Sequence, residues 1–206
     1  CNLGSIDLGK FVVKDDNASS YDFESLREVS RIAARFLDDV VSINTFPTKE
    51  VTEAVAATRK TGLGVMGWHD ALIRLGIPYE SPDALELGKQ VMAAITDEAR
   101  NVSLDLAVER GPYPGWQPAT PDELPIRNAT RTCIAPTGTI SAIANASGGI
   151  EPIFALAFVK NVLDGKQLRE VNYDFERIAK ERGFYSDELM DKVARTGSCQ
   201  YLSEVP

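Results

Sequence analysis

Residues 132–152 read TCIAPTGTISAIANASGGIEP, and this stretch decides how the chain is interpreted. A run that favours β structure ends at Pro136, and a turn of threonines and glycine then leads into small residues that favour a helix. A strand, a turn and a helix in this order predict an α/β fold with the turn at the end of a strand. The turn carries no acid, base or metal ligand, so its chemistry must come from backbone N–H groups and hydroxyls.

The turn at residues 136–141 has the features of an anion site. The first N–H groups of a helix have no partner within the helix, and the helix dipole favours a negative charge beside them. Gly138 allows a ligand to approach closely, and Thr137, Thr139 and Ser141 add hydroxyl donors. We interpret the turn as a candidate cradle for a phosphate or diphosphate. An ordinary turn with a serine- or threonine-type cap is the alternative, and capped helix starts are far more common.

Helical periodicity dominates the rest of the chain. Apolar residues recur at helical spacing from Phe23 to Val41, after a cap at Ser20 or Asp22. Further helices are predicted over residues 48–58, 81–111, 172–183 and 186–197, and strands over 5–13, 62–67, 130–135 and 153–159. Because helices separate the strands, we expect βα units and a parallel sheet.

The glycine-rich segment GLGVMG at residues 62–67 matches the dinucleotide-binding pattern G-x-G-x-x-G. That pattern requires a strand before the glycines and an acid about 20 residues further on, which Glu86 could supply. The residues before the glycines predict a helix instead. We therefore favour a strand of small residues that lets a neighbouring backbone or ligand approach. His69 is the only histidine, and we expect it to cap an element or lie at the surface.

The composition excludes several classes of function. With 22 basic and 30 acidic residues the net charge is −8, which argues against nucleic-acid binding. No apolar run approaches the roughly 18 residues of a membrane-spanning helix. CxxC, HExxH and Walker patterns are missing from the sequence, so we predict no metal site. The cysteines Cys1, Cys133 and Cys199 are odd in number and far apart, which favours a reducing, cytoplasmic location.

Three separated motifs resemble the large catalytic subunit of ribonucleotide reductases. They are CNLGSIDL at residues 1–8, RKTGLGVMG at 59–67 and APTGTIS with SGGIEP within 135–152, in the order seen in the family. PTGTIS, with FALAF after it and KERGFYSDELMDKVARTGS downstream, most resembles the class II, adenosylcobalamin-dependent branch. The resemblance spans essentially the whole chain. It implies that residues 1–206 are a helix-rich part of the second half-barrel of the family's ten-stranded α/β barrel domain.

The resemblance also assigns site residues. In the family the turn PTGTIS grips the substrate's diphosphate, and this role carries over to Pro136, Thr137, Gly138, Thr139, Ile140 and Ser141. The cysteine of CNLGS belongs to a redox pair that delivers two electrons to the ribose, and this role carries over to Cys1. Its partner lies in the family's other half-barrel. Cys133 and Cys199 match no catalytic position, and we interpret them as core or surface thiols.

One motif of the family is missing from the sequence. The finger loop Asn-x-Cys-x-Glu, which carries the radical cysteine in the family, is expected shortly before Cys1. The family's allosteric nucleotide site is also expected in an N-terminal part. We therefore interpret the chain as an internal fragment that is inactive alone and begins just after the finger loop. A start at Cys1 would also fit an intein junction, because inteins leave Cys, Ser or Thr as the first downstream residue, but a deliberately chosen boundary is the simpler explanation.

For the full parent, the resemblance implies reduction of ribonucleotides to deoxyribonucleotides by thiyl-radical chemistry with adenosylcobalamin. It does not imply that this fragment alone binds the cofactor. The expected partners are the ribonucleotide, the rest of the same subunit and a dithiol reductant such as thioredoxin. Two alternatives stay open, namely a class I large subunit and a non-enzymatic phosphate-binding module. The sequence does not distinguish diphosphate from triphosphate substrates.

Overall fold

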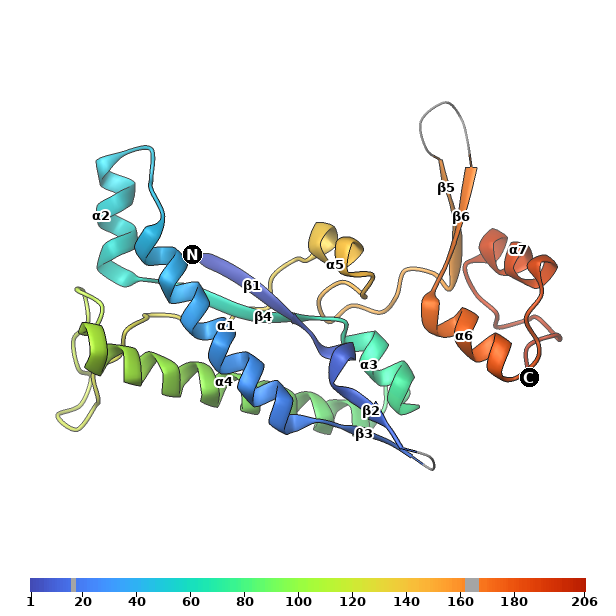
Figure 1. Ribbon diagram of the computed structural model, residues 1–206, viewed down its shortest axis with the longest axis horizontal. Coiled ribbons are helices and arrows are strands. Elements are labelled where there is room, and N and C mark those ends of the chain that lie inside the picture. Colours follow the sequence, from blue (N-terminus) through green and yellow to red (C-terminus); the bar gives the residue numbers. More distant parts are fainter. Residues whose placement is uncertain (16–17, 162–166) are drawn as a thin grey trace. The chain divides into compact units, whose positions relative to one another are not determined.

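The computed structural model describes residues 1–15, 18–161 and 167–206, which form two compact units (Figure 1). Unit 1 is Cys1–Glu151 and unit 2 is Pro152–Pro206. The elements of unit 1 are β1 (Asn2–Asp7), the 3-10 helix η1 (Leu8–Phe11), β2 (Val12–Lys14), β3 (Ser19–Tyr21), α1 (Phe23–Ile43), α2 (Lys49–Thr58), β4 (Thr61–Met66), α3 (Trp68–Leu75), α4 (Pro82–Arg110) and α5 (Gly138–Ala144). Those of unit 2 are β5 (Ala157–Asn161), β6 (Gln167–Val171), α6 (Tyr173–Glu181) and α7 (Asp187–Thr196).

A parallel pair of strands lies at the centre of unit 1. β1 and β4 pair in parallel, from Asn2 opposite Thr61 to Asp7 opposite Met66 (Figure 1). On the other edge of β4, the segment at residues 131–133 makes a single parallel bridge between Leu63 and Thr132. The predicted parallel sheet is therefore confirmed for unit 1, with the order β1, β4 and then this segment, whereas the strand predicted over residues 153–159 forms an antiparallel pair in unit 2. The strand predicted over residues 130–135 is reduced to one bridge.

The strand predicted over residues 5–13 is wrong as a single element. β1 ends at Asp7, whose carboxylate accepts the N–H of Gly9 at 3.1 Å and so caps the 3-10 turn η1. The chain then resumes as β2, which pairs antiparallel with β3. The carbonyl of Gly9 accepts from Nη1 of Arg74 at 2.6 Å, which ties the 3-10 turn to α3. In unit 2, only the last part of the strand predicted over 153–159 is regular, in β5.

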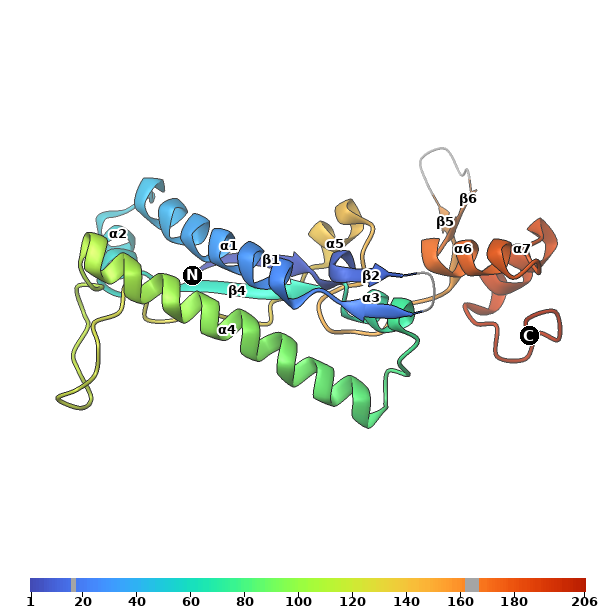
Figure 2. The same cartoon turned by 60° about the horizontal axis from the view of Figure 1, so that its bottom comes forward.

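The long helix α1 packs along the β1–β4 pair, and the long helix α4 packs against α1 (Figures 1 and 2). Asp22 caps α1 by accepting the N–H of Ser25, and Ser81 caps α4 by accepting the N–H of Ala84. The core between these elements includes the fully buried side chains of Leu26, Leu63, Val65 and Ile95. Each such burial stabilises the fold by about 1.5–3 kcal/mol.

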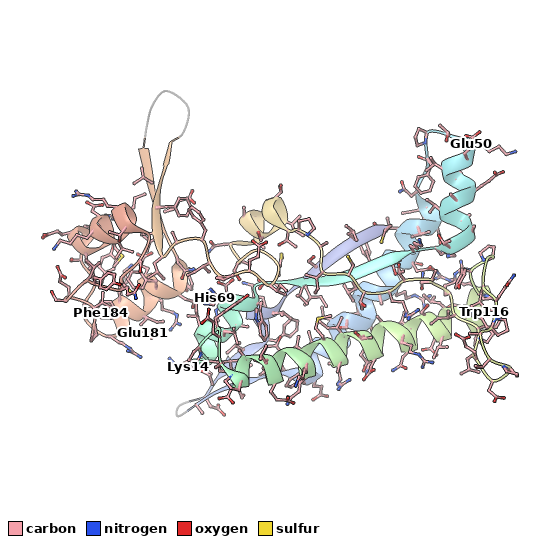
Figure 3. All side chains as sticks on the ribbon, turned by 180° about the vertical axis from the view of Figure 1, so that it is seen from behind. Lys14, Glu50, His69, Trp116, Glu181 and Phe184 are labelled. Carbon is pink, nitrogen blue, oxygen red and sulfur yellow. The ribbon has the colours of Figure 1, made fainter. Side chains whose placement is uncertain are left out.

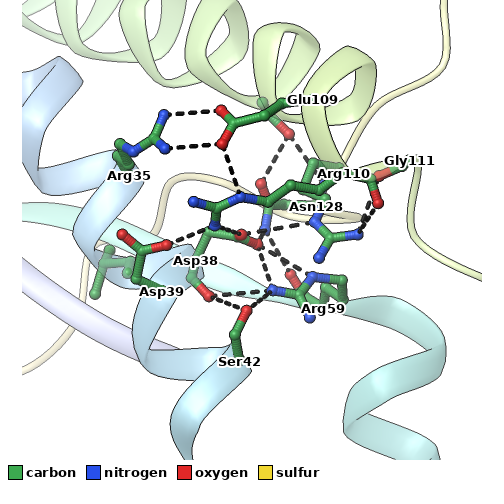
Figure 4. A network of polar contacts seen from close by, with 12 residues as sticks. Arg35, Asp38, Asp39, Ser42, Arg59, Glu109, Arg110, Gly111 and Asn128 are labelled. Carbon is green, nitrogen blue, oxygen red and sulfur yellow. Dashed lines mark hydrogen bonds and ion pairs between the residues drawn. The ribbon is translucent and has the colours of Figure 1, made fainter.

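A buried polar network joins the ends of these elements (Figure 4). Asp38 of α1 is fully buried, and its Oδ1 accepts from Nη2 of Arg59 at 2.8 Å and from Nδ2 of Asn128 at 2.8 Å. Nη1 of Arg110, the last residue of α4, lies 3.4 Å from the other carboxylate oxygen of Asp38. Arg59 adopts the left-handed conformation just before β4. The network therefore ties the end of α1 to the start of β4 and to the end of α4.

Unit 2 has a small core of its own. β5 and β6 form an antiparallel hairpin. Asn172 caps α6 and Ser186 caps α7, and α7 ends at Gly197 in the left-handed conformation, as the sequence predicts. The buried core residues are Ala157, Phe175, Ala179, Leu189, Met190 and Val193, and the partly buried Cys199 packs against them. In the described parts of both units, no helix is long and apolar enough to cross a membrane.

Candidate functional site

The turn predicted as an anion cradle forms the start of helix α5. Thr137 is the N-cap residue, and its side chain makes no capping hydrogen bond. The turn therefore differs from the serine- or threonine-capped start that was the alternative interpretation. The N–H groups of Gly138, Thr139 and Ile140 lie in the first turn, where a helix supplies no backbone acceptor. They are the donors that an anion could use.

The six predicted residues of the turn divide into an exposed and a buried set. Pro136, Gly138, Thr139 and Ile140 are exposed, whereas Thr137 and Ser141 are only 4% and 5% exposed. A Cβ placed on Gly138 would meet nothing within 4 Å, so the outer side of the turn is open to a ligand.

The two buried hydroxyls brace the turn. Oγ1 of Thr137 accepts the N–H of Gly149 at 2.7 Å, and Oγ of Ser141 donates to the carbonyl of Gly138 at 3.4 Å. The sequence suggested both hydroxyls as ligand donors. It could not show the contact of Thr137, because its partner Gly149 is brought in by the return loop at residues 146–151.

Residues of α3 and its flanks hold this return loop. The N–H of Ser147 donates to Oδ2 of Asp70 at 2.6 Å, and the N–H of Gly67 donates to the carbonyl of Ser147 at 2.8 Å. The hydroxyl of Tyr79 donates to the carbonyl of Ile150 at 2.7 Å. The motif SGGIEP is thus fixed to the segment that follows β4. No pattern in the sequence linked these two motifs.

Cys1 and Cys133 approach the same glycine of β4. A Cβ placed on Gly62 would lie 3.4 Å from Sγ of Cys1, 2.9 Å from Cβ of Cys133 and 2.7 Å from Cδ2 of Leu3. Both cysteines are exposed. A Cβ on Gly64 would collide with the carbonyl oxygen of Cys133. The interpretation of GLGVMG as a strand of small residues is therefore confirmed.

The glycines of GLGVMG do not have the strand before them that a dinucleotide-binding motif requires. The glycines lie within β4, and the element before them is the helix α2 rather than a strand. Glu86, the candidate acid, is exposed on α4 and pairs loosely with Lys89 at 3.5 Å. We therefore abandon the dinucleotide interpretation.

His69 lies in the first turn of α3 and is half-buried (Figure 3). Its ring packs edge-on against Tyr79, with 5.3 Å between the ring centroids. Burial lowers the pKa of the imidazole, and the nearby Asp70 opposes this effect. Within residues 1–15, 18–161 and 167–206, no three His, Cys, Asp or Glu side chains group so as to hold a metal ion.

One sheet holds Cys1 and the turn, at opposite ends of its strands. Cys1 precedes β1, and the N–H of Asn2 donates to the carbonyl of Lys60 at 3.2 Å, which fixes the cysteine beside the start of β4. The turn at residues 136–141 follows the carboxyl end of the third segment. In parallel α/β sheets, ligands bind at the carboxyl ends of the strands.

The comparison with protein families decides what this architecture is. The family model described as "Ribonucleotide reductase, barrel domain" matches residues 1–124 and 122–206. This chain belongs to the ribonucleotide reductase barrel-domain family. The resemblance of its three motifs to ribonucleotide reductases is thereby confirmed.

Of three reductases compared with this chain, the two that are named as vitamin B12-dependent have the higher sequence identity to it. The chain is 52% identical to the vitamin B12-dependent ribonucleoside-diphosphate reductase of Thermoplasma acidophilum, over 97% of this chain and 26% of the relative. It is 44% identical to the protein of the same name from Mycobacterium tuberculosis, over 100% of this chain and 29% of the relative. With the ribonucleoside-diphosphate reductase subunit alpha of Chlamydia muridarum it shares 34% identity, over 100% of the chain and 23% of that relative. The chain thus spans less than a third of the length of these reductases.

A solved structure confirms the fold class. The alpha subunit of the Actinobacillus ureae class Id ribonucleotide reductase superposes with a TM-score of 0.75 at 23% identity, covering 99% of this chain and 36% of that subunit. At this identity the match shows the fold alone. The helix-rich α/β chain with its short parallel sheet is therefore part of the reductase barrel.

Proposed function

We propose that this chain forms part of the catalytic barrel of an adenosylcobalamin-dependent ribonucleoside-diphosphate reductase. In this proposal the turn at residues 136–141 binds the substrate's diphosphate and Cys1 is one of two reducing thiols. The observation that carries the proposal is the open first turn of α5, where a Cβ on Gly138 would meet nothing within 4 Å, after the segment that bridges β4. The high identity with two vitamin B12-dependent reductases favours this branch of the family.

The backbone of the turn suits a diphosphate. The N–H groups of Gly138, Thr139 and Ile140 can donate to phosphate oxygens, and the start of α5 favours their negative charge. Because these donors are neutral backbone groups, the net charge of −8 does not prevent anion binding. Anchoring the diphosphate would hold the ribose in one place, which is how positioning lowers the barrier to the reaction at the sugar.

Cys1 would act as a reductant of the ribose. Reduction of a ribonucleotide replaces a hydroxyl by hydrogen and releases water, which requires two electrons and two protons. Two thiols supply both when they join as a disulfide. Cys1 is exposed and free, as this role requires, and we place its partner thiol in the rest of the subunit. A dithiol reductant such as thioredoxin would then restore both thiols, as expected in a reducing cytoplasm.

The described residues do not form a seat for adenosylcobalamin. The one histidine, His69, is half-buried against Tyr79 rather than presented as an open ligand. The exposed donors at the turn are backbone N–H groups, which suit an anion rather than a cobalt centre. We therefore place the cofactor with the rest of the subunit and derive no step through it.

Two rival functions make different predictions. A class I large subunit would obtain its radical from a separate subunit, so the purified full-length protein would not bind cobalamin, which is visible in its absorption spectrum. A free-standing phosphate-binding module would have no coding sequence for Asn-x-Cys-x-Glu upstream of Cys1. The relative named subunit alpha is less similar to the chain than the two vitamin B12-dependent relatives, which favours our proposal over the class I rival.

Titration with inorganic pyrophosphate tests the cradle. We expect pyrophosphate to shift the backbone amide NMR signals of Gly138, Thr139 and Ile140. Gly138→Val should weaken binding at least about tenfold, because its side chain occupies the space that the anion needs. The free energy of unfolding should change little, because a Cβ at this position meets nothing within 4 Å. Ile143→Val, on the exposed side of α5 outside the turn, is the control. Undiminished binding by Gly138→Val would show that the cradle is misassigned.

A further inference from the structure

Asp70 is a buried carboxylate that the proposed chemistry does not use. It lies in the first turn of α3, where the helix dipole favours a negative charge, and its residue is only 4% exposed. Its Oδ2 accepts the N–H of Ser147 at 2.6 Å. A carboxylate that accepts a buried N–H makes a charge-assisted hydrogen bond, which is stronger than one between neutral groups. Asp70 therefore fixes Ser147 firmly.

The backbone N–H and the carbonyl of Ser147 both make hydrogen bonds to the segment between β4 and the first turn of α3. While its N–H donates to Asp70, its carbonyl accepts the N–H of Gly67 at 2.8 Å. Gly67 is left-handed with φ of 70°, and a Cβ there would collide with the carboxylate of Asp7. Only glycine suits this conformation without strain. The segment between β4 and α3 thus forms a two-point clamp on Ser147.

The clamp reaches the anion turn through the return loop. Two residues after Ser147, the N–H of Gly149 donates to Oγ1 of Thr137 at 2.7 Å. Thr137 is the N-cap of α5 and is buried, so this bond fixes the residue from which the turn starts. Asp70 is therefore connected to the turn by two short hydrogen bonds and two residues of backbone.

We propose that Asp70 is a positioning residue for the anion cradle. It touches no ligand itself, but it holds Ser147, and through Gly149 and Thr137 it orients the N–H groups at the start of α5. Without Asp70 the buried N–H of Ser147 would lose its acceptor, which favours a shift of the return loop. This inference rests on the proposed function, because the cradle must bind a diphosphate for its orientation to matter.

Amide hydrogen exchange tests the clamp without any ligand. In Asp70→Ala, the amides of Ser147 and Gly149 should exchange at least about tenfold faster, because a buried hydrogen bond is lost. Asp70→Asn keeps an oxygen acceptor and should retain most of the protection. Asp97→Ala, which removes an exposed carboxylate from α4, should match the unchanged chain. Equal exchange in Asp70→Ala and the unchanged chain would overturn the clamp.

Binding of inorganic pyrophosphate tests the positioning role. Asp70→Ala should bind pyrophosphate at least about tenfold more weakly, and Asp70→Asn should restore the affinity to within about threefold. Rescue by asparagine distinguishes positioning from a general loss of stability, which the urea midpoint reports. If pyrophosphate binds the unchanged chain and Asp70→Ala equally well, the inference is overturned while the proposed function stands.

Two further outcomes remain decisive. If the unchanged chain does not bind pyrophosphate, the proposed function fails, and with it the positioning role. If Asp70→Ala does not fold, Thr137→Val breaks the other end of the connection with a side chain of the same shape. The amide of Gly149 must then exchange faster, and unchanged exchange would overturn the connection between clamp and turn.

Discussion

Single residues explain why β4 is rich in glycine. Gly62 and Gly64 lie where the backbone and side chain of Cys133 pass closest to the strand, and a Cβ at either position would meet Cys133 at less than ordinary contact distance. The sequence predicted a strand of small residues approached by a neighbour. It could not name the neighbour, because Cys133 is about 70 residues away in the chain and pairing over such a separation is a tertiary property.

Gly64→Ala tests this steric account. The added methyl group would collide with the carbonyl of Cys133, so we expect a loss of about 1–3 kcal/mol in the free energy of unfolding. Gly88→Ala is the matched control, because a Cβ there would lie 3.6 Å from Trp68, at ordinary contact distance within α4. That variant should be neutral or stabilised by up to about 1 kcal/mol. Urea unfolding measures both, and equal stability of the two variants would contradict the account.

His69 makes the stability depend on pH. Burial lowers the pKa of its imidazole below the ordinary value of 6.5, so the unfolded chain takes up the proton first as the pH falls. The contribution of this group is complete above about pH 6.5 and is lost as the pH falls below that value. Because His69 is the only histidine, His69→Asn should flatten the urea midpoint between about pH 7 and 5. An unchanged slope in the variant would rule out this origin.

At the scale of elements, the N-cap residues of the helices were easier to predict than the faces that the helices bury. Asp22, Ser81, Asn172 and Ser186 all accept the capping N–H that their side chains suggested, because a cap depends only on residues nearby in the sequence. The buried face of a helix depends on its neighbours. In α1 the predicted stripe includes Ile32 and Phe36, which are both 63% exposed, whereas the polar residues Ser30 and Asp38 are buried.

The buried network around Asp38 is a contact between elements that the sequence could not show. Its charged partners are Arg59, which follows the last residue of α2, Arg110 at the end of α4, and Arg127. Arg127 and the amide partner Asn128 come from the loop after α4. Nothing in the pattern of α1 marked Asp38 as different from its neighbour Asp39. Only in the folded chain is Asp38 buried and bonded to Arg59 and Asn128.

Asp38→Ala should therefore be much more harmful than Asp39→Ala. Removing Asp38 leaves the guanidinium of Arg59 buried without its carboxylate, for which we expect a loss of about 3–5 kcal/mol. Asp39 pairs with Arg110 at a partly exposed position, so its removal should cost less than about 1 kcal/mol. Urea unfolding of both variants measures the difference. Similar losses in the two variants would show that the buried network does not stabilise the fold as described.

At the scale of the whole molecule, the sequence predicted the family and the parallel sheet but not the division into units. Motif order survives in the sequence, which is why CNLGSIDL, GLGVMG and PTGTIS identified the reductase barrel. The separate core of residues 152–206 depends on which side chains meet in space, and no change of composition marks its border at Glu151. The hydrogen bond between Asp70 and Ser147, which holds the loop beside the anion turn, could not be predicted either, because the two residues lie in different motifs of the sequence.

The central claim is that this chain supplies the reductase with a diphosphate cradle and one reducing thiol. The most direct test is deoxynucleotide formation by the full-length protein carrying Cys1→Ser, with adenosylcobalamin and a dithiol reductant present. Cys199→Ser is the matched control, and the 206-residue chain alone, which contains no finger-loop cysteine, is the inactive reference. We predict that Cys1→Ser binds substrate normally but cannot sustain turnover, because one thiol of the pair is missing. Sustained turnover by Cys1→Ser, or by the 206-residue chain alone, would contradict the account.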